Sequence, residues 1–471
     1  MTTNPRLDEL KSALSNRLLV IDGAMGTAIQ NRDLGPDDFG GAEYEGCNEY
    51  LIVTRPDVIE DIHRSYLEAG ADIIETDTFG STPVVLAEYD LAHEARRLNR
   101  AAAALARRVA EEYSIPDKPR FVAGSMGPTT KTISVTGGIT FEELAADYHT
   151  QAAGLIEGGV DLLLLETSQD TINVKAGLEG IDRAFAELAR EVPVAVQGTV
   201  EPMGTLLAGQ DVEAFYTSLS HRDLLWIGLN CATGPSFMTD HIRSLAALSK
   251  FPVACVPNAG MPDEDGNYNE TPEIMAETVG RFVESGWVNL IGGCCGTVPK
   301  HVELLVKTAA GKPVRPGIES YETRVSGIDV LLIDDDVRPA IVGERTNVLG
   351  SRRFRRMIKE GSFEEAAEIG RRQVRNGAHI LDVCLQDPDR DEAADVSQFL
   401  DLVTKKVKAP IMIDSTDSAV IELALKRLQG KSIINSINLE DGEERFQAVV
   451  PLARRFGAAL VVGCIDDDKE Q

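Results

Sequence analysis

The chain has 471 residues, of which 43% are hydrophobic and 26% charged, and its formal net charge at pH 7 is −28. This composition is that of a folded globular protein, and so acidic a chain argues against nucleic acid or an anionic membrane as a partner, because both need basic patches. The N-terminal segment lacks the apolar core of a signal peptide, and no apolar run reaches the ~18 residues of a membrane span, so we expect a cytoplasmic protein.

Short apolar runs alternate with amphipathic helical stretches along the first two thirds of the chain, the pattern of βα units around a parallel sheet. The runs are rich in Val, Ile and Leu with little alternation, which is typical of strands buried on both faces. They predict an α/β fold whose first domain, residues 1–325, is a (β/α)8 TIM barrel. The predicted strands are 18–22, 71–76, 121–125, 160–167, 193–199, 224–230, 252–258 and 287–293.

Small or polar residues stand at the C-terminal ends of most of these strands, where barrel enzymes place their active sites. Asp22 ends the first strand and Glu166 stands near the end of the fourth. Cys231 follows the sixth strand, and Cys294 and Cys295 follow the eighth. We therefore expect one converging site at this end of the barrel.

Seven cysteines in a chain without a signal peptide do not predict a disulfide framework, so clustered cysteines are better candidates for metal ligands or nucleophiles. Strands six and eight are separated by one strand, so Cys231 can meet Cys294 and Cys295. Adjacent residues on a regular strand point to opposite faces, and the glycines of GGCCG (292–296) allow the bend that brings both sulfurs together. Three thiolates with an open fourth position predict a zinc ion that binds and activates a substrate thiol.

Two alternatives remain open for these cysteines. All three can be unrelated buried residues, since free cysteine is among the most buried residue types. A fourth protein ligand would make the metal structural rather than catalytic. Cys255 lies inside a predicted strand and is expected in the core, whereas Cys47, in an early loop, stays a candidate.

Four motifs in order, DGAMGT (22–27), ETDTFG (75–80), GLNC (228–231) and GGCCGT (292–297), resemble the zinc-dependent homocysteine methyltransferase family over about residues 10–310. The resemblance implies that homocysteine binds to zinc on the three cysteines, which are then both metal ligands and catalytic residues. The implied substrate-binding residues are Asp22, Gly23, Gly26, Thr27 and Glu166.

The physical reason for this set is that a carboxylate can pair with the α-ammonium group of homocysteine, while backbone N–H groups near Gly23 and Gly26 can receive its carboxylate. The alternatives are that Asp22 only forms a turn and that Glu166 is a solvated charge. Members of the family differ in methyl donor, which is betaine, S-methylmethionine, or folate through cobalamin.

The periodic pattern lapses between residues 309 and 326, where prolines, glycines and mixed charge predict a linker. A βα rhythm then resumes, with candidate strands at 339–345, 379–385, 410–416, 431–437 and 458–465. We predict a second, incomplete TIM-barrel-like domain over residues 326–471. An open sheet exposes strand edges, so we expect the chain to be a fragment whose second domain is unstable and binds folate poorly.

Polar groups again end the strands of this second domain, at Glu344, Asn347, Asp382, Asp414 and Asn435. A carboxylate such as Asp414 can accept from the amino group and the ring N–H on one edge of a pterin, and the two asparagines can serve other ring atoms. The alternative for Asp414 is a helix N-cap.

The motifs VGERTNVLGS (342–351), LDVC (381–384), IDST (413–416) and INSIN (434–438) resemble the pterin-binding barrels of cobalamin-dependent methionine synthase, dihydropteroate synthase and corrinoid methyltransferases. The resemblance implies folate contacts for the five residues just named. A homocysteine barrel followed by a pterin barrel resembles the N-terminal half of cobalamin-dependent methionine synthases. That order implies methyl transfer from 5-methyltetrahydrofolate to L-homocysteine through cobalamin, giving methionine.

No D-x-H-x-x-G signature of a cobalamin-binding module occurs in the sequence, so we expect cobalamin on another module or chain. Three alternatives remain. The first is a cobalamin-independent homocysteine S-methyltransferase that uses betaine or S-methylmethionine. The second is a non-catalytic zinc- or thiol-binding protein, and the third is an inactive truncated product.

Overall fold

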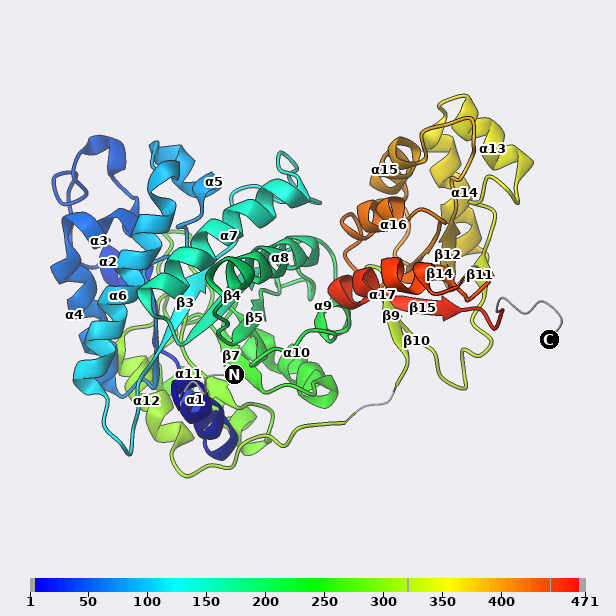
Figure 1. Cartoon of the computed structure of the whole chain (residues 1–471). Helices are drawn as coiled ribbons and strands as arrows, with labels where there is room; N and C mark the ends of the chain where they lie inside the picture. Colours follow the sequence, from blue (N-terminus) through cyan, green and yellow to red (C-terminus); the bar gives the residue numbers. More distant parts are fainter. Residues whose placement is uncertain (1–4, 320–321, 441, 466–471) are drawn as a thin grey trace. The chain divides into compact units, whose positions relative to one another are not determined.

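The computed structural model describes residues 5–319, 322–440 and 442–465. The chain forms two compact units. The first comprises Met1–Ala208 and Asp223–Glu319, and the second comprises Gly209–Arg222 and Ser320–Gln471. Figure 1 shows the elements of both units in chain order.

Eight parallel strands form the sheet of the first unit in the order β1-β8-β7-β6-β5-β4-β3-β2. Backbone hydrogen bonds from Asp72 to Val20 (2.7 Å) and from Asp22 to Ile73 (3.0 Å) join β1 to β2 and close the barrel. The predicted barrel is therefore confirmed. Its strands are β1 (Leu19–Val20), β2 (Ile73–Glu75), β3 (Phe121–Met126), β4 (Leu162–Ser168), β5 (Val194–Gly198), β6 (Ile227–Asn230), β7 (Val253–Val256) and β8 (Leu290–Ile291).

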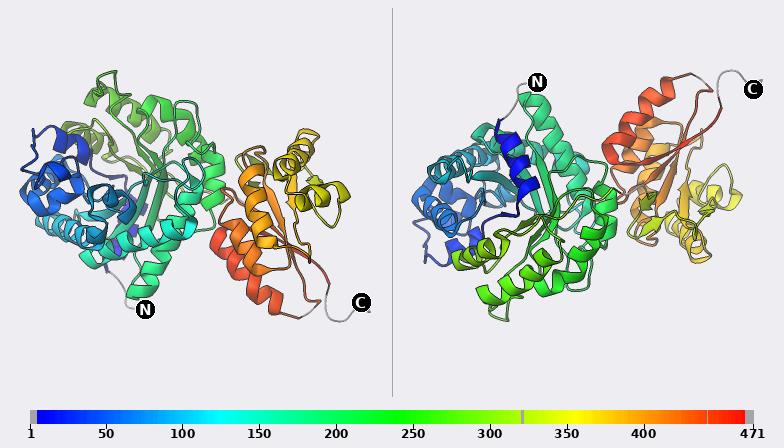
Figure 2. Two further views of the ribbon diagram at one scale, coloured as in Figure 1. Left: turned by 90° about the horizontal axis from the view of Figure 1, so that it is seen from above. Right: turned by 90° about the horizontal axis from the view of Figure 1, so that it is seen from below.

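Helices surround the strands of this unit on the outside, as two further views show (Figure 2). The N-terminal helix is α1 (Pro5–Asn16), and the long helices that follow the strands are α4 (Pro56–Ala69), α6 (Ala95–Tyr113), α7 (Phe141–Gly158), α8 (Thr171–Leu188), α10 (Pro235–Leu248), α11 (Pro272–Glu284) and α12 (Pro299–Ala309). Shorter elements are α2 (Met25–Gln30), α3 (Leu51–Thr54), α5 (Pro83–Leu86) and the 3-10 turns 42–44, 48–50, 87–89 and 92–94.

Local sequence explains where these helices begin. Thr140 caps α7: its hydroxyl accepts the N–H of Glu143, whose carboxylate accepts the N–H of Thr140 in return. Asp170 caps α8 by accepting the N–H of Ile172 at 2.9 Å. Each pairing satisfies backbone donors that a helix N-terminus leaves without a partner.

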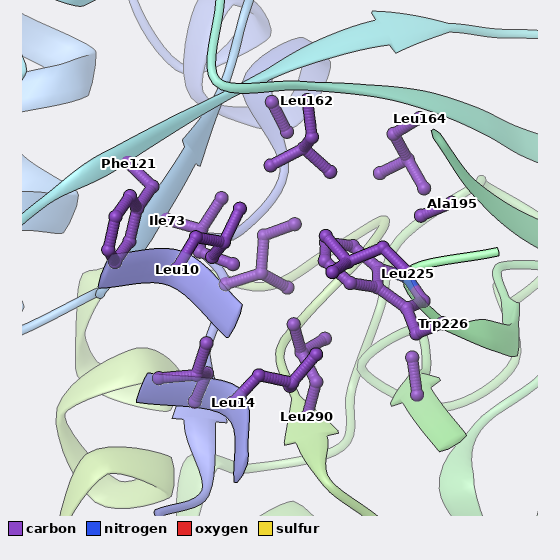
Figure 3. Close-up of a cluster of buried hydrophobic side chains, with 14 of the residues drawn as sticks. Leu10, Leu14, Ile73, Phe121, Leu162, Leu164, Ala195, Leu225, Trp226 and Leu290 are labelled. Carbon is purple, nitrogen blue, oxygen red and sulfur yellow. The ribbon is translucent and has the colours of Figure 1, made fainter. Parts of the chain in front are cut away.

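The interior of the barrel is an apolar core that α1 covers at one end. Leu10 and Leu14 point from α1 into a cluster of strand side chains that includes Phe121, Leu164 and Trp226 (Figure 3). Burial of each leucine contributes roughly 1.5–3 kcal/mol. Apolar packing thus occupies the N-terminal ends of the strands, and the polar residues lie at the opposite, C-terminal ends.

The second unit contains a parallel sheet of five strands in the order β11-β12-β13-β14-β15. Its strands are β11 (Val342–Gly343), β12 (Ile380–Val383), β13 (Ile411–Asp414), β14 (Ile433–Ile437) and β15 (Ala459–Val462). Its helices are α9 (Val212–Leu219), α13 (Arg352–Lys359), α14 (Phe363–Arg375), α15 (Glu392–Val403), α16 (Ser418–Leu425) and α17 (Glu444–Phe456). The five predicted strands of this region are all present.

An antiparallel hairpin of β9 (Arg324–Ser326) and β10 (Val330–Leu332) precedes this sheet. Val325 and Leu331 pack with Ile380, Met412 and Ile433, close to the N-terminal ends of the sheet strands. The end of the predicted linker therefore forms part of a core. Farther upstream, Arg315 is buried and donates to the carbonyls of residues 246, 249 and 251, so that part of the predicted linker is fixed to the first unit.

Among the described residues, no helix is both long enough and apolar enough to cross a membrane.

Candidate metal and substrate sites

Three cysteines come together at the C-terminal end of the barrel. Cys231 follows β6, and Cys294 and Cys295 follow β8. Their sulfur atoms all lie within 4.8 Å of one another, and those of Cys231 and Cys295 are 3.7 Å apart. The left-handed backbone of Cys231, with φ of 59°, turns the chain out of the strand at that residue.

Glycine is required on both sides of the Cys294–Cys295 pair. A Cβ atom on Gly292 would lie 2.2 Å from Ile21, and one on Gly296 would lie 2.2 Å from Tyr268. Gly296 also has a φ of 78°, in the left-handed region that favours glycine. These two glycines therefore permit the tight turn that brings both sulfurs to Cys231, as the GGCCG motif predicts.

The donor set fits zinc. Three sulfur ligands suit a borderline-soft ion with tetrahedral preference, and they leave one coordination position for a substrate. Among the residues that the structure describes, this trio is the group of His, Cys, Asp and Glu side chains whose spacing suits a metal ion. Cys255 is buried in β7 beside Met238, as expected for a core residue, and Cys47 is buried and outside the trio.

The trio also favours an anionic sulfur without any metal. Hydrogen bonds from the thiols of Cys231 and Cys294 lower the pKa of Cys295 to about 3. The hydroxyl of Tyr268 forms a further hydrogen bond to Cys295, which also lowers that pKa. A cation bound at the trio would take the place of the thiol protons that stabilise this thiolate.

Two of the predicted substrate residues are buried carboxylates near the trio. Asp22 accepts the N–H of Glu75 at 3.0 Å through Oδ2, and its Oδ1 has no hydrogen-bond partner among the described residues. Glu166 accepts from the hydroxyl of Ser125 at 2.5 Å and from Asn230 at 3.0 Å. Only 5% of Glu166 is exposed, so it is not a solvated surface charge.

Burial raises the pKa values of these carboxyls. The pKa of Asp22 lies well above its ordinary value, chiefly through burial, and that of Glu166 is raised to about 7 for the same reason. Glu75 belongs with them: burial raises its pKa, and the charges of Glu166 and Asp22 add to the effect. Three acidic groups that repel one another in a buried place favour an ammonium group between them.

Asn230 lies between Glu166 and Cys294 and contacts both. Its Nδ2 donates to Glu166 and to the Thr167 hydroxyl (2.8 Å), lies 3.9 Å from the sulfur of Cys294, and its Oδ1 accepts the N–H of Thr167 at 2.7 Å. Asn230 ends the predicted sixth strand, and the sequence alone indicates no role for it. Its position directly before Cys231, at the end of a barrel strand, was the available signal.

The glycine-rich turn after β1 is joined to the turn after β8. Thr27 accepts the N–H of Gly296 at 3.0 Å, and Thr297 accepts the N–H of Ala24 at 3.2 Å. A Cβ atom on Gly23 would lie 2.8 Å from both Thr297 and Tyr66, so only glycine fits there. Gly26 and Thr27 lie in the first turn of α2, where backbone N–H groups precede the first i−4 hydrogen bond.

A second polar group lies at the C-terminal ends of the strands in the second unit. Asn347 donates through Nδ2 to Asp382 at 3.3 Å and to Asp414 at 3.2 Å. Burial, followed by the charge of Asp414, raises the pKa of Asp382 to about 7, and a hydrogen bond with Asn435 opposes the rise. Glu344 is exposed, and its charge also raises the pKa values of both aspartates.

Asp414 is not a helix cap. Asp417 caps α16 instead, accepting the N–H of Ala419 at 2.8 Å. The guanidinium group of Arg445, on α17, donates to the carbonyls of Ser415 (2.7 Å) and Thr416 (2.6 Å). Arg445 therefore holds the segment that follows Asp414, a role that sequence reasoning did not find.

Comparison with known proteins matches each unit to a family. Residues 19–309 match the family described as homocysteine S-methyltransferase, and residues 343–471 match the family described as pterin binding enzyme. Two solved structures of the homocysteine methyltransferase MmuM from Escherichia coli are similar in fold.

The metallated form of MmuM is 23% identical, with a TM-score of 0.52, and the match covers 64% of this chain and 99% of that one. The oxidized form is 22% identical, with a TM-score of 0.51, and the match covers 62% and 95% of the two chains.

Proposed function

Because the chain belongs to the homocysteine S-methyltransferase family and continues into a pterin-binding domain, we propose that it methylates homocysteine to methionine with a methyl group from 5-methyltetrahydrofolate. This order of domains is that of the N-terminal half of methionine synthase. The observation that carries the proposal is the trio of Cys231, Cys294 and Cys295 beside buried carboxylates in one barrel.

In this proposal the barrel binds homocysteine by its amino acid part and its sulfur. Glu166 and Asp22 accept hydrogen bonds from the α-ammonium group, whose charge offsets the repulsion between buried carboxylates. Backbone N–H groups at Gly23, Gly26 and Thr27 receive the α-carboxylate, because they precede the first i−4 hydrogen bond of α2. Asn230 keeps Glu166 oriented, and the turn at Gly296 keeps the sulfurs converged.

Zinc held by the three cysteines would lower the pKa of a substrate thiol and keep its sulfur nucleophilic at neutral pH. The chain itself positions the substrate thiol for the reaction. It excludes water from the buried carboxylates and leaves one side of the sulfur open to the methyl donor.

The second unit holds the methyl donor in this proposal. Asp382 and Asp414 accept from the amino and ring N–H groups of the pterin, and Asn347 and Asn435 bind neighbouring ring atoms. Glu344 lies at the rim of the same site. Cobalamin, held on another module, would supply the methyl-carrying chemistry between the folate and the homocysteine thiolate.

A cobalamin-independent enzyme that uses betaine or S-methylmethionine is the rival within the same family. Such a reaction gives the second unit no role, whereas the pair of aspartates bridged by Asn347 suits a heterocycle with adjacent donors. Measured turnover with betaine or S-methylmethionine in the absence of cobalamin would favour the rival.

Two half-reactions with free cobalamin test the proposal. In the first, zinc-loaded protein transfers the methyl group of methylcobalamin to homocysteine, releasing cob(I)alamin and methionine. In the second, 5-methyltetrahydrofolate and a proton convert cob(I)alamin to methylcobalamin and tetrahydrofolate. Both are followed by the cobalamin absorbance.

Each half-reaction has a variant that serves as the control for the other. We expect Cys295→Ser to abolish the first and spare the second, and Asp414→Asn to do the reverse. Absence of methionine with the zinc-loaded wild-type protein, or full activity of Cys295→Ser, would contradict the proposal.

A further inference from the structure

The loop between β7 and α11 places an aromatic side chain beside the cysteine trio. Residues 261–267 and Asn269 are exposed, whereas Tyr268 is half-buried. The side chain of Tyr268 packs on the turn after β8, because a Cβ atom on Gly296 would lie 2.2 Å from its Cβ and Cγ atoms. The hydroxyl of Tyr268 donates a hydrogen bond to the sulfur of Cys295.

Hydrogen bonds within the loop hold Tyr268 in this position. At the base of the loop, Ala259 donates its N–H to the carbonyl of Cys295 at 2.9 Å and accepts the N–H of Glu270 at 3.1 Å. At the tip, the carboxylate of Asp263 accepts the N–H groups of two later residues at 3.1 and 2.8 Å. The chain therefore fixes the hydroxyl on the sulfur without any contribution from a substrate.

The other two sulfurs of the trio also accept hydrogen bonds. The sulfur of Cys231 accepts the backbone N–H of the next residue, and that of Cys294 accepts from Asn230 over the longer distance of 3.9 Å. Only Cys295 has a hydroxyl donor, and that donor comes from a separate loop. A hydrogen bond to an anionic sulfur stabilises the charge and makes the sulfur a weaker nucleophile.

The chemistry of methyl transfer gives such a donor a use. All three cysteines are only partly buried, so a methyl donor that can reach a substrate sulfur at the trio can also reach theirs. Methylation would convert a cysteine thiolate into a neutral thioether, and the site would lose a ligand. The protein sulfurs must therefore react more slowly than the sulfur of the substrate.

We propose that Tyr268 is a positioning residue that directs the methyl group to homocysteine by weakening the Cys295 thiolate as a nucleophile. The inference rests on the proposed function, because it assumes zinc on the trio and a methyl donor beside it. The hydroxyl acts through the sulfur that it contacts, as hydrogen bonds around a metal site adjust the properties of its ligands.

The alternative is that Tyr268 serves only to pack its ring on Gly296. Tyr268→Phe separates the two roles, because it keeps the ring and removes the hydroxyl. The probe is iodoacetamide, which forms an S–C bond with a cysteine sulfur and releases iodide. The rate at each cysteine of the zinc-loaded full chain is followed by mass spectrometry of its peptides.

We expect Tyr268→Phe to raise the alkylation rate of Cys295 about tenfold, equivalent to ~1.4 kcal/mol in the barrier. The rates at Cys231 and Cys294 and the zinc content before alkylation should stay unchanged. With methylcobalamin in place of iodoacetamide, the variant should accumulate S-methylcysteine at position 295. In that step the S–C bond forms, the Co–C bond breaks, and its electron pair stays on cobalt as cob(I)alamin.

Tyr148→Phe is the matched control, since it makes the same chemical change at another buried tyrosine. The hydroxyl of Tyr148, on α7, donates to the carbonyl of Gly127 at 2.9 Å rather than to a cysteine. We expect this variant to be alkylated at Cys295 as slowly as the wild-type protein.

Two results would overturn the inference alone. One is an equal rate at Cys295 in the wild-type protein and Tyr268→Phe. The other is equally faster alkylation of all three cysteines with loss of zinc, which would mean that the hydroxyl retains the metal. Absence of zinc from the wild-type protein would refute the proposed function, and the inference with it.

Discussion

Replacing Asn230 by alanine separates a positioning role at the candidate site from a purely structural one. The side chain is fully buried and makes three short hydrogen bonds, two with Thr167 and one with Glu166. Its loss leaves the N–H of Thr167 and one carboxylate oxygen of Glu166 without partners in a buried place. At ~1–3 kcal/mol for each of these two unsatisfied groups, the free energy of unfolding should fall by about 2–6 kcal/mol.

The same substitution should weaken homocysteine binding. Glu166 would keep only its hydrogen bond from Ser125, so its carboxylate would no longer be fixed toward the α-ammonium group. We expect the Kd of the zinc-loaded protein for homocysteine to rise about tenfold, equivalent to ~1.4 kcal/mol, in isothermal titration calorimetry. Urea denaturation measures the accompanying loss of stability.

Asn99 provides the control. It is fully buried in α6, and its Nδ2 donates to the carbonyls of Ala95 (2.7 Å) and Ser81 (2.8 Å), away from the cysteines. Asn99→Ala should lose a comparable amount of stability and bind homocysteine as the wild-type protein does. If Asn230→Ala binds homocysteine as tightly as Asn99→Ala, the positioning role of Asn230 is refuted.

Three further predictions concern the core and the second unit. Leu14→Ala should lower the free energy of unfolding by about 2–5 kcal/mol by opening a cavity beneath the barrel, and should leave zinc content unchanged. Burial raises the pKa of Asp382 from 3.8 to about 7, so between these pH values the folded state keeps a proton that the unfolded state releases. Stability of the second unit should therefore fall as pH rises through this window, by at most about 1.4 kcal/mol per pH unit, and Asp382→Asn should flatten the slope in urea denaturation at several pH values. Arg445→Ala frees the carbonyls of Ser415 and Thr416, so folate binding should weaken about tenfold while zinc-dependent methionine formation from methylcobalamin stays unchanged; equal effects on both units would contradict this assignment.

Apolar runs were sufficient to predict every strand of the two parallel sheets, because strands buried on both faces carry continuous Val, Ile and Leu. The hairpin at 324–332 was missed because its strands lack such a continuous apolar run. Val330, Leu331 and Leu332 are only partly buried, and the three-residue strands β9 and β10 carry no long periodic signal. Their pairing depends on packing against strands that come later in the chain.

The convergence of the three cysteines was predictable because the turn that brings them together needs glycine, and GGCCG shows both the glycines and the sulfurs. The hydrogen bonds that support this turn were not predictable, because they join segments that are distant in the sequence. The residues of the pairs Thr297–Ala24 and Thr27–Gly296 are 273 and 269 positions apart. Glu75 was overlooked because its role depends on the proximity of Asp22 and Glu166, which only the closed barrel provides. Whether these residues bind substrate stays a prediction.

The zinc content of the purified protein, measured with and without homocysteine, shows whether the three cysteines hold an ion that activates the substrate thiol. We expect about one zinc per chain. It should be lost in Cys294→Ser and kept in the control Cys255→Ala, because the sulfur of Cys255 lies in the core. Homocysteine binding should release a proton, seen as a binding enthalpy that depends on the buffer, because a coordinated thiol is deprotonated. Three results would contradict this role of the cysteines: absence of zinc in the wild-type protein, full zinc occupancy in Cys294→Ser, or homocysteine binding without proton release.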